Sequence, residues 1–449
     1  MKPFADMTLE ELLSPQGHDC PCGRRHHAGL RLTSVGPNAM DDLPRFLGEL
    51  GVRKPFILSD VNTRAAAWPL LGPALERAGV EFAEYSFAEA HLEPDEHACG
   101  SALMAFDRSC DGLLVVGSGV LNDVGKVLNH AAGLPFVVVA TAPSMDGYAS
   151  DSSSMIRGRI KVSLYNACPH AVVADTRILS AAPMRMLQAG LGDMLAKYLS
   201  ICEWRIAHLV TGEYYCPEIA ALVRASLKKI VDSAEGLRAR DPDAVAKVVE
   251  GLLLSGVAMA FAGISRPASG LEHYFSHMWE MMSLDRGLPT ELHGIQVGIG
   301  TLLTLKLWEK LKALQPSREK AEAFIRGFDE GEWEAMVRRV FGGAAEGILA
   351  AARAQGRNDP AAHARRLDRT LEGWPEILRI AAEELPTHRD TEALMLRMGM
   401  PTQPGDIGFS RQDTVDALVG ARDIRDKYLT SSLLWDLGLL YEPGTHAAL

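Results

Sequence analysis

Short apolar runs between residues 50 and 180 constrain the fold of this chain more than any other feature. Helical segments such as DVGKVLNHAAG separate them, and most runs end at Gly, Asp or Thr. The runs are KPFILSD (54–60), GLLVVGSG (112–119), LPFVVVAT (134–141) and HAVVAD (170–175). Continuous apolar runs are typical of strands buried on both faces of a parallel sheet of βαβ units. The segment therefore predicts an α/β domain.

After about residue 180 the pattern becomes helical. PMRMLQAGLGDMLAKYLSICEWRIAH, AALVRASLKKIVDSAEGL and VAKVVEGLLLSGVAMAFAGI show helical periodicity, and no comparable strand-like run follows. We therefore expect an N-terminal arm over residues 1–30, an α/β domain with a parallel sheet over 31–182, and an all-helical domain over 183–449.

Composition excludes several classes of function. The net charge of -11 argues against a nucleic-acid partner, which needs an excess of Lys and Arg. The longest apolar run, at 251–264, is too short to span a bilayer, and the acidic start has no signal-peptide core. Seven scattered cysteines, an odd number, indicate reduced thiols. We expect a cytoplasmic protein with no membrane insertion.

The stretch HDCPCGRRHH at 18–27 holds two cysteines and three histidines. A zinc knuckle needs four ligands, and Cys-x-Cys is tighter than the usual Cys-x-x-Cys turn. We expect a polar N-terminal arm here, with a metal site as the alternative.

The stretch VVGSGVLNDVGKVLNH (115–130) is a strand, a Gly-x-Gly turn and a helix. Glycines let the backbone approach a pyrophosphate, and the helix N-terminus offers unpaired N–H groups. By itself the Gly-x-Gly motif is weak evidence for a nucleotide site, because it also suits a tight turn that binds no ligand. The next predicted strand ends in ATAPSMDGYASDSSS (140–154), a polar loop where α/β sheets bind ligands.

Asp60 ends the first predicted strand of the sheet. A carboxylate at this position suits the ribose hydroxyls of NAD and would repel the 2′-phosphate of NADP. An N-cap of the following helix is the alternative role.

Three histidines follow in the helical half. His273 and His277 are four residues apart and share one helix face, and His293 follows a Gly/Pro break, at the expected start of the next helix. Asp193 lies in an apolar helical stretch, where an unpaired carboxylate would be costly. Each histidine alone is more often a core or surface residue, but the set favours a metal with an open position.

The ordered motifs GSGVLNDVGK, TAPSMDGYAS, GLGDMLAK, SRPASGLEHYFSHMWE and LHGIQVGIGT resemble the sn-glycerol-1-phosphate dehydrogenases over roughly residues 30–310. These enzymes belong to the metal-dependent alcohol dehydrogenase, glycerol dehydrogenase and dehydroquinate synthase-like superfamily. The resemblance implies the dehydroquinate synthase-like fold, NAD with NADP as an alternative, and one divalent metal, zinc or nickel.

The resemblance also implies roles for single residues. The metal ligands would be Asp193, His273 and His293; the substrate contacts would be Asp146, Asp193 and His277, with Asp193 and His277 catalytic. The implied cofactor contacts are Asp60, Gly119, Val120, Leu121, Asn122, Asp123, Thr141, Ala142, Pro143, Ser144 and Ser150. Lys197 stands where four-ligand iron relatives carry histidine, so we expect three ligands and an open position.

The implied reaction is the reversible reduction of dihydroxyacetone phosphate to sn-glycerol 1-phosphate. The metal would polarise the carbonyl, the dihydronicotinamide would deliver hydride, and water or His277 would supply the proton. Arg266 and Lys161 are candidates for a phosphate clamp, although both could be surface charges. Alternatives are a glycerol or other polyol dehydrogenase, a dehydroquinate synthase-like lyase, and a nucleotide-binding scaffold without chemistry. We expect a homo-oligomer, a dimer or larger.

Overall fold

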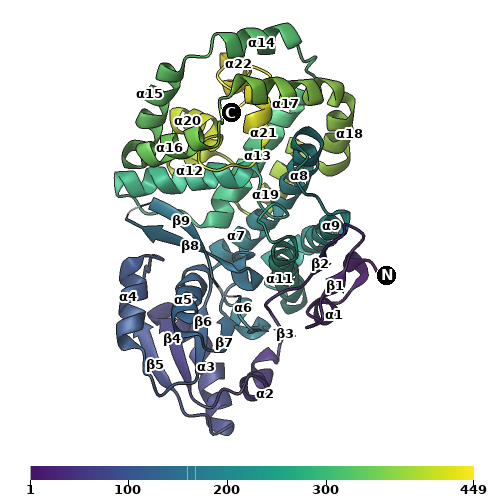
Figure 1. The fold of residues 1–449 in the computed structure, drawn as a ribbon. Helices are drawn as coiled ribbons and strands as arrows, with labels where there is room; N and C mark the ends of the chain where they lie inside the picture. Colours follow the sequence, from purple (N-terminus) through teal and green to yellow (C-terminus); the bar gives the residue numbers. More distant parts are fainter. Residues whose placement is uncertain (1, 159, 167) are drawn as a thin grey trace. The chain divides into compact units, whose positions relative to one another are not determined.

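The computed structural model describes residues 2–158, 160–166 and 168–449, which form two compact units (Figure 1). Unit 1 comprises Met1–Met194 and Cys216–Ala268, and unit 2 comprises Leu195–Tyr215 and Ser269–Leu449. The predicted class, a parallel sheet followed by a large helical part, is confirmed. The division by packing differs from the expected boundary at residue 182, because the helices over 217–262 pack with the sheet-bearing unit.

Unit 1 contains a six-stranded sheet in the order β3-β10-β7-β6-β4-β5, and all neighbouring strands are parallel. The strands are β3 (Leu32–Gly36), β4 (Pro55–Asp60), β5 (Ala83–Phe87), β6 (Gly112–Gly117), β7 (Phe136–Ala140) and β10 (Ala171–Asp175). The four apolar runs of the sequence are the four inner strands β4, β6, β7 and β10. The sequence analysis missed β3 and β5, the two edge strands.

Helices cover both faces of this sheet, which explains why its inner strands do not alternate. Leu114 and Val116 pack into one cluster with α2 (Leu43–Glu49) and α3 (Val61–Arg77). On the other face α5 (Gly119–Ala132) packs so closely that a Cβ on Gly125 would lie 2.5 Å from Val115 Cγ2.

The strand order reverses between β4 and β6. From β4 the chain continues to the outer strand β5, whereas from β6 it continues to β7 on the other side (Figure 1). A crevice for ligands forms at such a reversal, outside the carboxyl ends of the strands. Asp60 ends β4 and Gly117 ends β6, so two predicted cofactor segments meet there.

The remaining elements of unit 1 surround the sheet. They are α1 (Leu9–Leu12), α4 (Glu96–Ala105), α6 (Thr176–Leu179), α7 (Met184–Leu195, ending at the first residue of unit 2), α9 (Pro217–Asp232), α10 (Ala234–Arg238), α11 (Pro242–Ala262), the 3-10 turns η1 (Phe4–Asp6), η2 (Ala39–Asp42) and η3 (Gly147–Ala149), and the antiparallel pairs β1 (His18–Asp19) with β2 (Arg25–His26) and β8 (Ser152–Arg157) with β9 (Ile160–Tyr165). The polar loop expected over 140–154 thus ends before Ser152, which begins β8.

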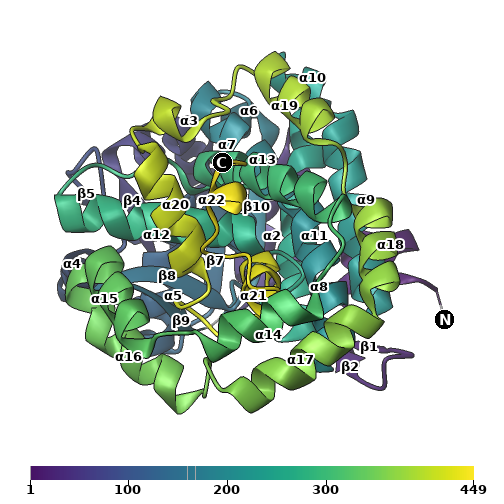
Figure 2. The ribbon, with the colours of Figure 1, turned by 90° about the horizontal axis from the view of Figure 1, so that it is seen from above.

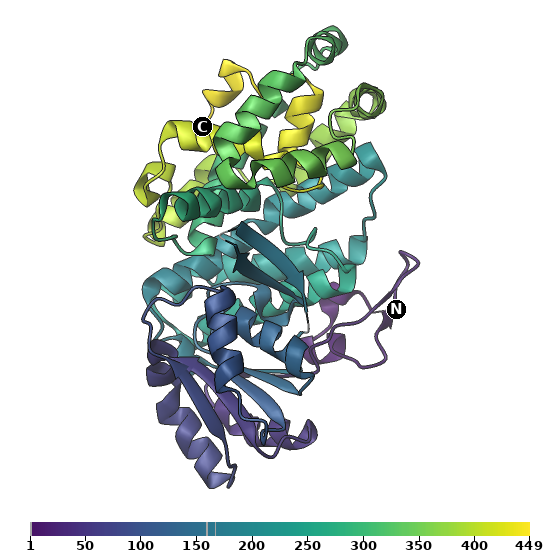
Figure 3. The ribbon, with the colours of Figure 1, turned by 60° about the vertical axis from the view of Figure 1, so that its left-hand side comes forward.

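Residues 2–30, expected as an N-terminal arm, pack on the helices of unit 1. Phe4, Leu12 and Leu30 are fully buried. Phe4 packs edge-on against Phe261, η1 contacts α9, and β2 contacts α11. Figures 1 and 3 show the N-terminal segment beside the helices of unit 1. Apolar side chains spaced along a polar segment therefore attach it to the helices of unit 1.

Residues 251–262 of the apolar run lie in α11, which has 21 residues and is long and apolar enough to cross a membrane by length and composition. It is the one such helix among the described residues, and 72% of its most apolar window is buried inside the protein. Its packing against α9 is that of a core helix.

Unit 2 is helical throughout its described residues. Its helices are α8 (Lys197–Thr211), α12 (Leu271–Arg286), α13 (His293–Lys312), α14 (Arg318–Arg326), α15 (Glu330–Phe341), α16 (Ala345–Ala354), α17 (Pro360–Glu372), α18 (Trp374–Glu384), α19 (His388–Arg397), α20 (Arg411–Ala421), α21 (Thr430–Asp436) and α22 (Pro443–His446), with 3-10 turns η4 (Gly342–Ala344) and η5 (Pro404–Ile407). One core holds Trp279, Trp308 and Trp435. Within it α12 and α13 pack against each other (Figure 2).

Candidate active-site residues

The glycine loop of unit 1 joins β6 to α5. Ser118 lies between the two glycines, and its Oγ is 2.6 Å from Ser144 Oγ in the loop after β7. The helix begins at Gly119, and its first intrahelical bond runs from Asn122 N–H to Ser118 O at 2.9 Å. The N–H groups of residues 119–121 therefore lack acceptors within the helix, which makes this end suitable for an anion.

A buried lysine holds the loop after β7 against α5. Lys126 Nζ donates to Gly147 O at 2.7 Å, to Ser152 O at 2.9 Å and to Ser150 Oγ at 3.1 Å. Burial lowers the pKa of Lys126, although Asp123 opposes this shift. The sequence analysis missed Lys126; its signal is a lysine among the apolar residues of α5.

Asn122 also faces this loop. Its Nδ2 donates to Gly147 O at 3.2 Å, while its buried Oδ1 has no hydrogen-bond partner in the part of the chain that the structure describes. A buried acceptor without a donor is uncommon in proteins, and it suits a site that a ligand completes.

Asp60 caps α3, as the alternative interpretation held. Its Oδ1 accepts from the N–H groups of Asn62 and Thr63, each at 2.8 Å. Both cap bonds use the same oxygen, and no described residue donates to Oδ2. Capping and binding of a ribose hydroxyl are therefore compatible.

Asp146 and Asp193 lie together in unit 1. The N–H of Asp146 donates to Asp193 Oδ2 at 2.9 Å, and Ser255 Oγ donates to Asp146 Oδ2 at 2.8 Å. Both aspartates are buried. Gly190, one turn before Asp193 on α7, permits this approach, because a Cβ there would clash with Pro143 O.

The three histidines lie together in unit 2. His273 and His277 are on α12, and His293 is the first residue of α13, as predicted. The ring centroids of His273 and His293 are 5.2 Å apart, and those of His277 and His293 are 5.7 Å apart.

Carboxylates orient these imidazoles. His273 Nδ1 lies 2.9 Å from Glu272 Oε1, and His293 Nδ1 lies 3.3 Å from Glu280 Oε1 and 3.0 Å from Ser276 Oγ. A carboxylate on Nδ1 fixes the tautomer and leaves Nε2 as the ligand nitrogen, as in many metal sites.

Glu280 was missed in the sequence analysis. It is buried, three residues after His277 on α12, and that spacing on an apolar helix is its only sequence signal. Its Oε2 lies 3.4 Å from His277 Nδ1. Ligand atoms of His277, Glu280 and His293 lie within 4.8 Å of one another, so unit 2 offers a second possible ligand set.

The pKa of His277 differs from the ordinary value assumed for a proton relay. Burial, aided by the charge of Arg425, lowers it to about 3, although Glu280 opposes the shift. In the metal-free protein His277 is thus a neutral imidazole near pH 7. In the metal-free protein this environment therefore disfavours a relay group that titrates near neutrality.

The two candidates for a phosphate clamp lie in unit 1. Arg266 is 1% exposed, so its interpretation as a surface charge is wrong. Lys161 is half-buried on β9. Arg425, which acts on His277, is a further cation that the sequence analysis missed.

Known proteins with similar sequences indicate the family of this chain. Residues 34–183 match the family described as iron-containing alcohol dehydrogenase. The glycerol-1-phosphate dehydrogenase (NAD(P)+) of Halalkalibacterium halodurans is 32% identical over 326 residues, which are 72% of this chain and 79% of that protein. The corresponding protein of Geobacillus stearothermophilus is 31% identical over 335 residues, covering 74% of this chain and 82% of the relative.

Solved structures agree on the fold. The NADH-dependent butanol dehydrogenase A of Thermotoga maritima superposes with a TM-score of 0.58, covering 94% of this chain and 99% of that chain at 14% identity. The maleylacetate reductase of Agrobacterium tumefaciens gives a TM-score of 0.56 over 92% and 96% of the two chains at 13% identity. These identities establish the fold alone. Because its sequence relatives are more than 30% identical over most of both chains, this chain belongs to the glycerol-1-phosphate dehydrogenase family.

Proposed function

We propose that this chain catalyses the reversible, NAD(P)-dependent reduction of dihydroxyacetone phosphate to sn-glycerol 1-phosphate. The observation that carries the proposal is the pair α12 and α13, whose three imidazoles are in ring contact, in a chain whose relatives are named glycerol-1-phosphate dehydrogenases. The family and the donor chemistry together favour a metal-dependent oxidoreductase over a scaffold without chemistry.

The proposed metal ligands are Asp193, His273 and His293. The residues fit a divalent cation, because both histidines have a carboxylate at Nδ1 and Asp193 is a buried carboxylate with one oxygen already hydrogen-bonded. A set of two imidazoles and one carboxylate suits zinc or nickel. When bound, the metal polarises the substrate carbonyl as a Lewis acid and NAD(P)H supplies the hydride.

The proposed cofactor site is the crevice at the carboxyl ends of β4, β6 and β7. The N–H groups at the start of α5 would bind the pyrophosphate, and Asp60 Oδ2 would accept from an adenosine ribose hydroxyl. The negative charge of Asp60 supports a preference for NAD over NADP. Lys126 keeps the loop over residues 141–150 in place through two hydrogen bonds to it and a third to Ser152 O, at the start of β8.

His277 and Asp146 are the proposed substrate contacts. The Nδ1–H of His277 points to Glu280, so its neutral ring offers Nε2 as an acceptor to a substrate hydroxyl. Asp146 is held by Ser255 and by its own N–H bond to Asp193, which restricts its motion. Both residues would orient the substrate toward the hydride donor.

A phosphate dianion needs cations nearby. Arg266 and Lys161 remain the candidates from unit 1, and Arg425 is the candidate from unit 2, because its charge acts on His277. Charge-assisted hydrogen bonds to phosphate are strong and directional. Loss of the true clamp should raise KM for dihydroxyacetone phosphate far more than for dihydroxyacetone.

One assay tests the proposed function. Metal-loaded protein is given NADH with either dihydroxyacetone phosphate or dihydroxyacetone, and NADH oxidation is followed. We expect kcat/KM to favour the phosphate by at least roughly a hundredfold, since phosphate binding energy is used at the reacting carbon. Equal values would instead indicate a polyol dehydrogenase, and no oxidation of NADH or NADPH with either ketone would reject the assignment.

A further inference from the structure

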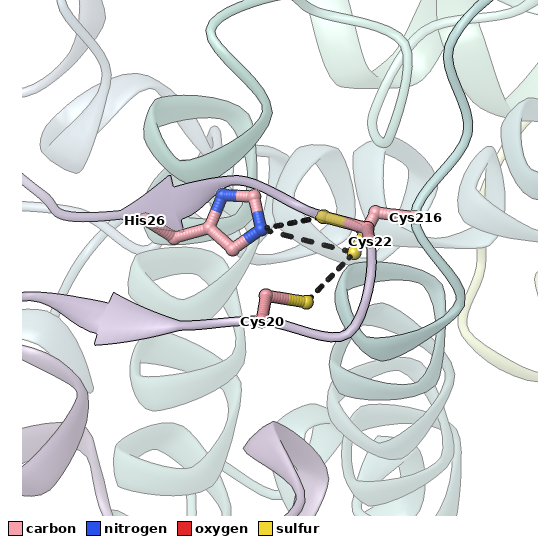
Figure 4. Close-up of side chains that lie close together, drawn as sticks. All are labelled: Cys20, Cys22, His26 and Cys216. Carbon is pink, nitrogen blue, oxygen red and sulfur yellow. Dashed lines mark hydrogen bonds between the residues drawn. The ribbon is translucent and has the colours of Figure 1, made fainter.

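Four metal-binding side chains meet in unit 1, and none of them belongs to the proposed active site. Cys20 and Cys22 lie in the turn of the β1–β2 hairpin, His26 is on β2, and Cys216 immediately precedes α9. Figure 4 shows the three thiols and the imidazole pointing toward one another. None of the seven cysteines, all of which the structure describes, forms a disulfide.

The distances within this cluster match those of a tetrahedral site. Cys20 Sγ lies 3.6 Å from Cys216 Sγ, and His26 Nε2 lies 3.2 Å from Cys22 Sγ and 3.9 Å from Cys216 Sγ. All four ligand atoms fall within 4.8 Å of one another. A zinc ion at ordinary bond lengths places two thiolate sulfurs about 3.8 Å apart, and a sulfur and an imidazole nitrogen about 3.6 Å apart.

The surroundings hold the ligands in this arrangement. His26 Nδ1 lies 2.7 Å from Phe261 O, which directs Nε2 at the thiols. The His26 ring stacks on Phe261 at 5.7 Å and meets Phe4 edge-on at 5.8 Å. A backbone carbonyl at the second nitrogen of a histidine is the usual outer support of a metal site.

Backbone hydrogen bonds close the hairpin turn that carries Cys20 and Cys22. Cys20 N–H donates to Arg24 O and Gly23 N–H donates to Cys20 O, each at 3.0 Å. Gly23 has a φ of 83°, which a residue with a side chain rarely adopts. The Cys-x-Cys spacing, tight as it is, thus brings both thiols to one side, where a distant cysteine completes the set.

We propose that Cys20, Cys22, His26 and Cys216 bind one structural zinc ion. On binding, the three thiols release three protons to solvent and the imidazole remains neutral. No open ligand position remains, which distinguishes this site from one for catalysis. The ion would fasten the N-terminal segment to the start of α9, across 190 residues of sequence.

The chemistry of the pocket supports a cation over free thiols. His26 and Cys216 are almost fully inaccessible, at 1% and 0% exposure. Three sulfurs and one imidazole in tetrahedral arrangement select zinc among common divalent metals. A Cys20–Cys216 disulfide is the competing outcome, and it would leave Cys22 and His26 without a role.

Metal analysis of the purified full-length protein tests this proposal. Cys22→Ser and Cys216→Ser should each lose one equivalent of zinc per chain and lower Tm by about 5 °C or more, with kcat unchanged. Cys99→Ser, a half-buried cysteine of α4 outside the cluster, is the matched control and should keep the zinc. Unchanged zinc content in both cluster variants, or a Cys20–Cys216 disulfide found by mass spectrometry, would overturn the assignment.

A second measurement covers variants that fail to fold. In the wild-type protein, titration with a mercurial thiol reagent should release one equivalent of zinc, and protein refolded with cobalt(II) should show thiolate-to-cobalt charge-transfer absorption. Asp193→Asn should keep that absorption, because it affects only the metal of the proposed function. The structural zinc site and the proposed active-site metal can thus be rejected independently of each other. Absence of both zinc release and the cobalt band would reject the structural site.

Discussion

The backbone N–H of Asp146 lies 2.9 Å from Asp193 Oδ2, and this bond joins the loop after β7 to the end of α7. One oxygen of Asp193 is therefore occupied by the protein itself. Binding of a metal is a second, proposed role of the same carboxylate. Structural and ligand roles of this carboxylate can thus be separated by substitution.

Asp193→Asn should lose the active-site metal and retain the fold. The amide oxygen of asparagine can still accept from Asp146 N–H, but it is a far weaker metal ligand than a carboxylate. Asp193→Ala removes the acceptor as well and should reduce the free energy of unfolding of the metal-free protein by ~1–3 kcal/mol. Elemental analysis and urea unfolding measure the two effects. Full metal content in Asp193→Asn would show that the carboxylate is not a ligand.

Substitutions on α12 distinguish the two possible ligand sets, which share His293. If the ligands are Asp193, His273 and His293, His273→Ala should lose the metal, while Glu280→Gln should retain most of it. The reverse result would favour His277, Glu280 and His293 as the ligands. NADH binding, followed by fluorescence, serves as the folding control, since the glycine loop belongs to unit 1.

His277→Ala should retain the metal and lose turnover. The side chain is assigned to the substrate, and loss of a group that orients or exchanges protons typically lowers kcat by roughly 10²–10⁴-fold. Metal content and kcat are measured on the same sample. A metal-free variant would mean that His277 is a ligand.

Asp60→Ser should narrow the preference for NADH over NADPH. Serine preserves the N-cap of α3 but removes the charge that would repel a 2′-phosphate. We expect KM for NADPH to fall by about tenfold, which corresponds to about 1.4 kcal/mol. Asp95→Ser, at the N-cap of α4, is the control for capping alone. If both variants and the wild type showed the same cofactor preference, Asp60 would act only as the N-cap of α3.

Part of the fold follows from sequence patterns. β4, β6, β7 and β10 were predicted because strands buried on both faces are apolar throughout. β3 and β5 escaped prediction because edge strands are partly exposed and mix polar with apolar residues. The assignment of α9 to α11 to unit 1 depends on long-range packing, which no local pattern records.

For the sites, too, local sequence patterns predicted the local arrangement but not the contacts between distant segments. The histidine spacing on α12 and the position of His293 were correct, since helical periodicity is a local property. Cys216 could not be associated with Cys20 and Cys22, because the fourth ligand lies 196 residues after Cys20. Glu280 and Lys126 were overlooked because a single charge in an apolar helix has many ordinary explanations.

Stability should decline below neutral pH partly through His170. This residue precedes β10, and its Nδ1 accepts from Phe136 N–H at 3.1 Å. Burial, together with the charge of Arg31, lowers its pKa. The unfolded chain therefore takes up the proton first, and the free energy of unfolding falls as pH drops below about 6.5. His170→Gln should show a flatter decline between pH 7.5 and 5.5 in urea unfolding. If the free energy of unfolding fell in parallel with pH for the variant and the wild type, groups other than His170 would cause the decline.

The product of the reduction should be sn-glycerol 1-phosphate and not its mirror image. The nicotinamide of unit 1, the metal and the phosphate cation would hold the ketone at three points, and three fixed points leave only one face of the carbonyl toward the hydride donor. An enzyme specific for sn-glycerol 3-phosphate should therefore leave the product unconsumed. Substantial consumption of the wild-type product would contradict the proposed stereochemistry, whatever the rate.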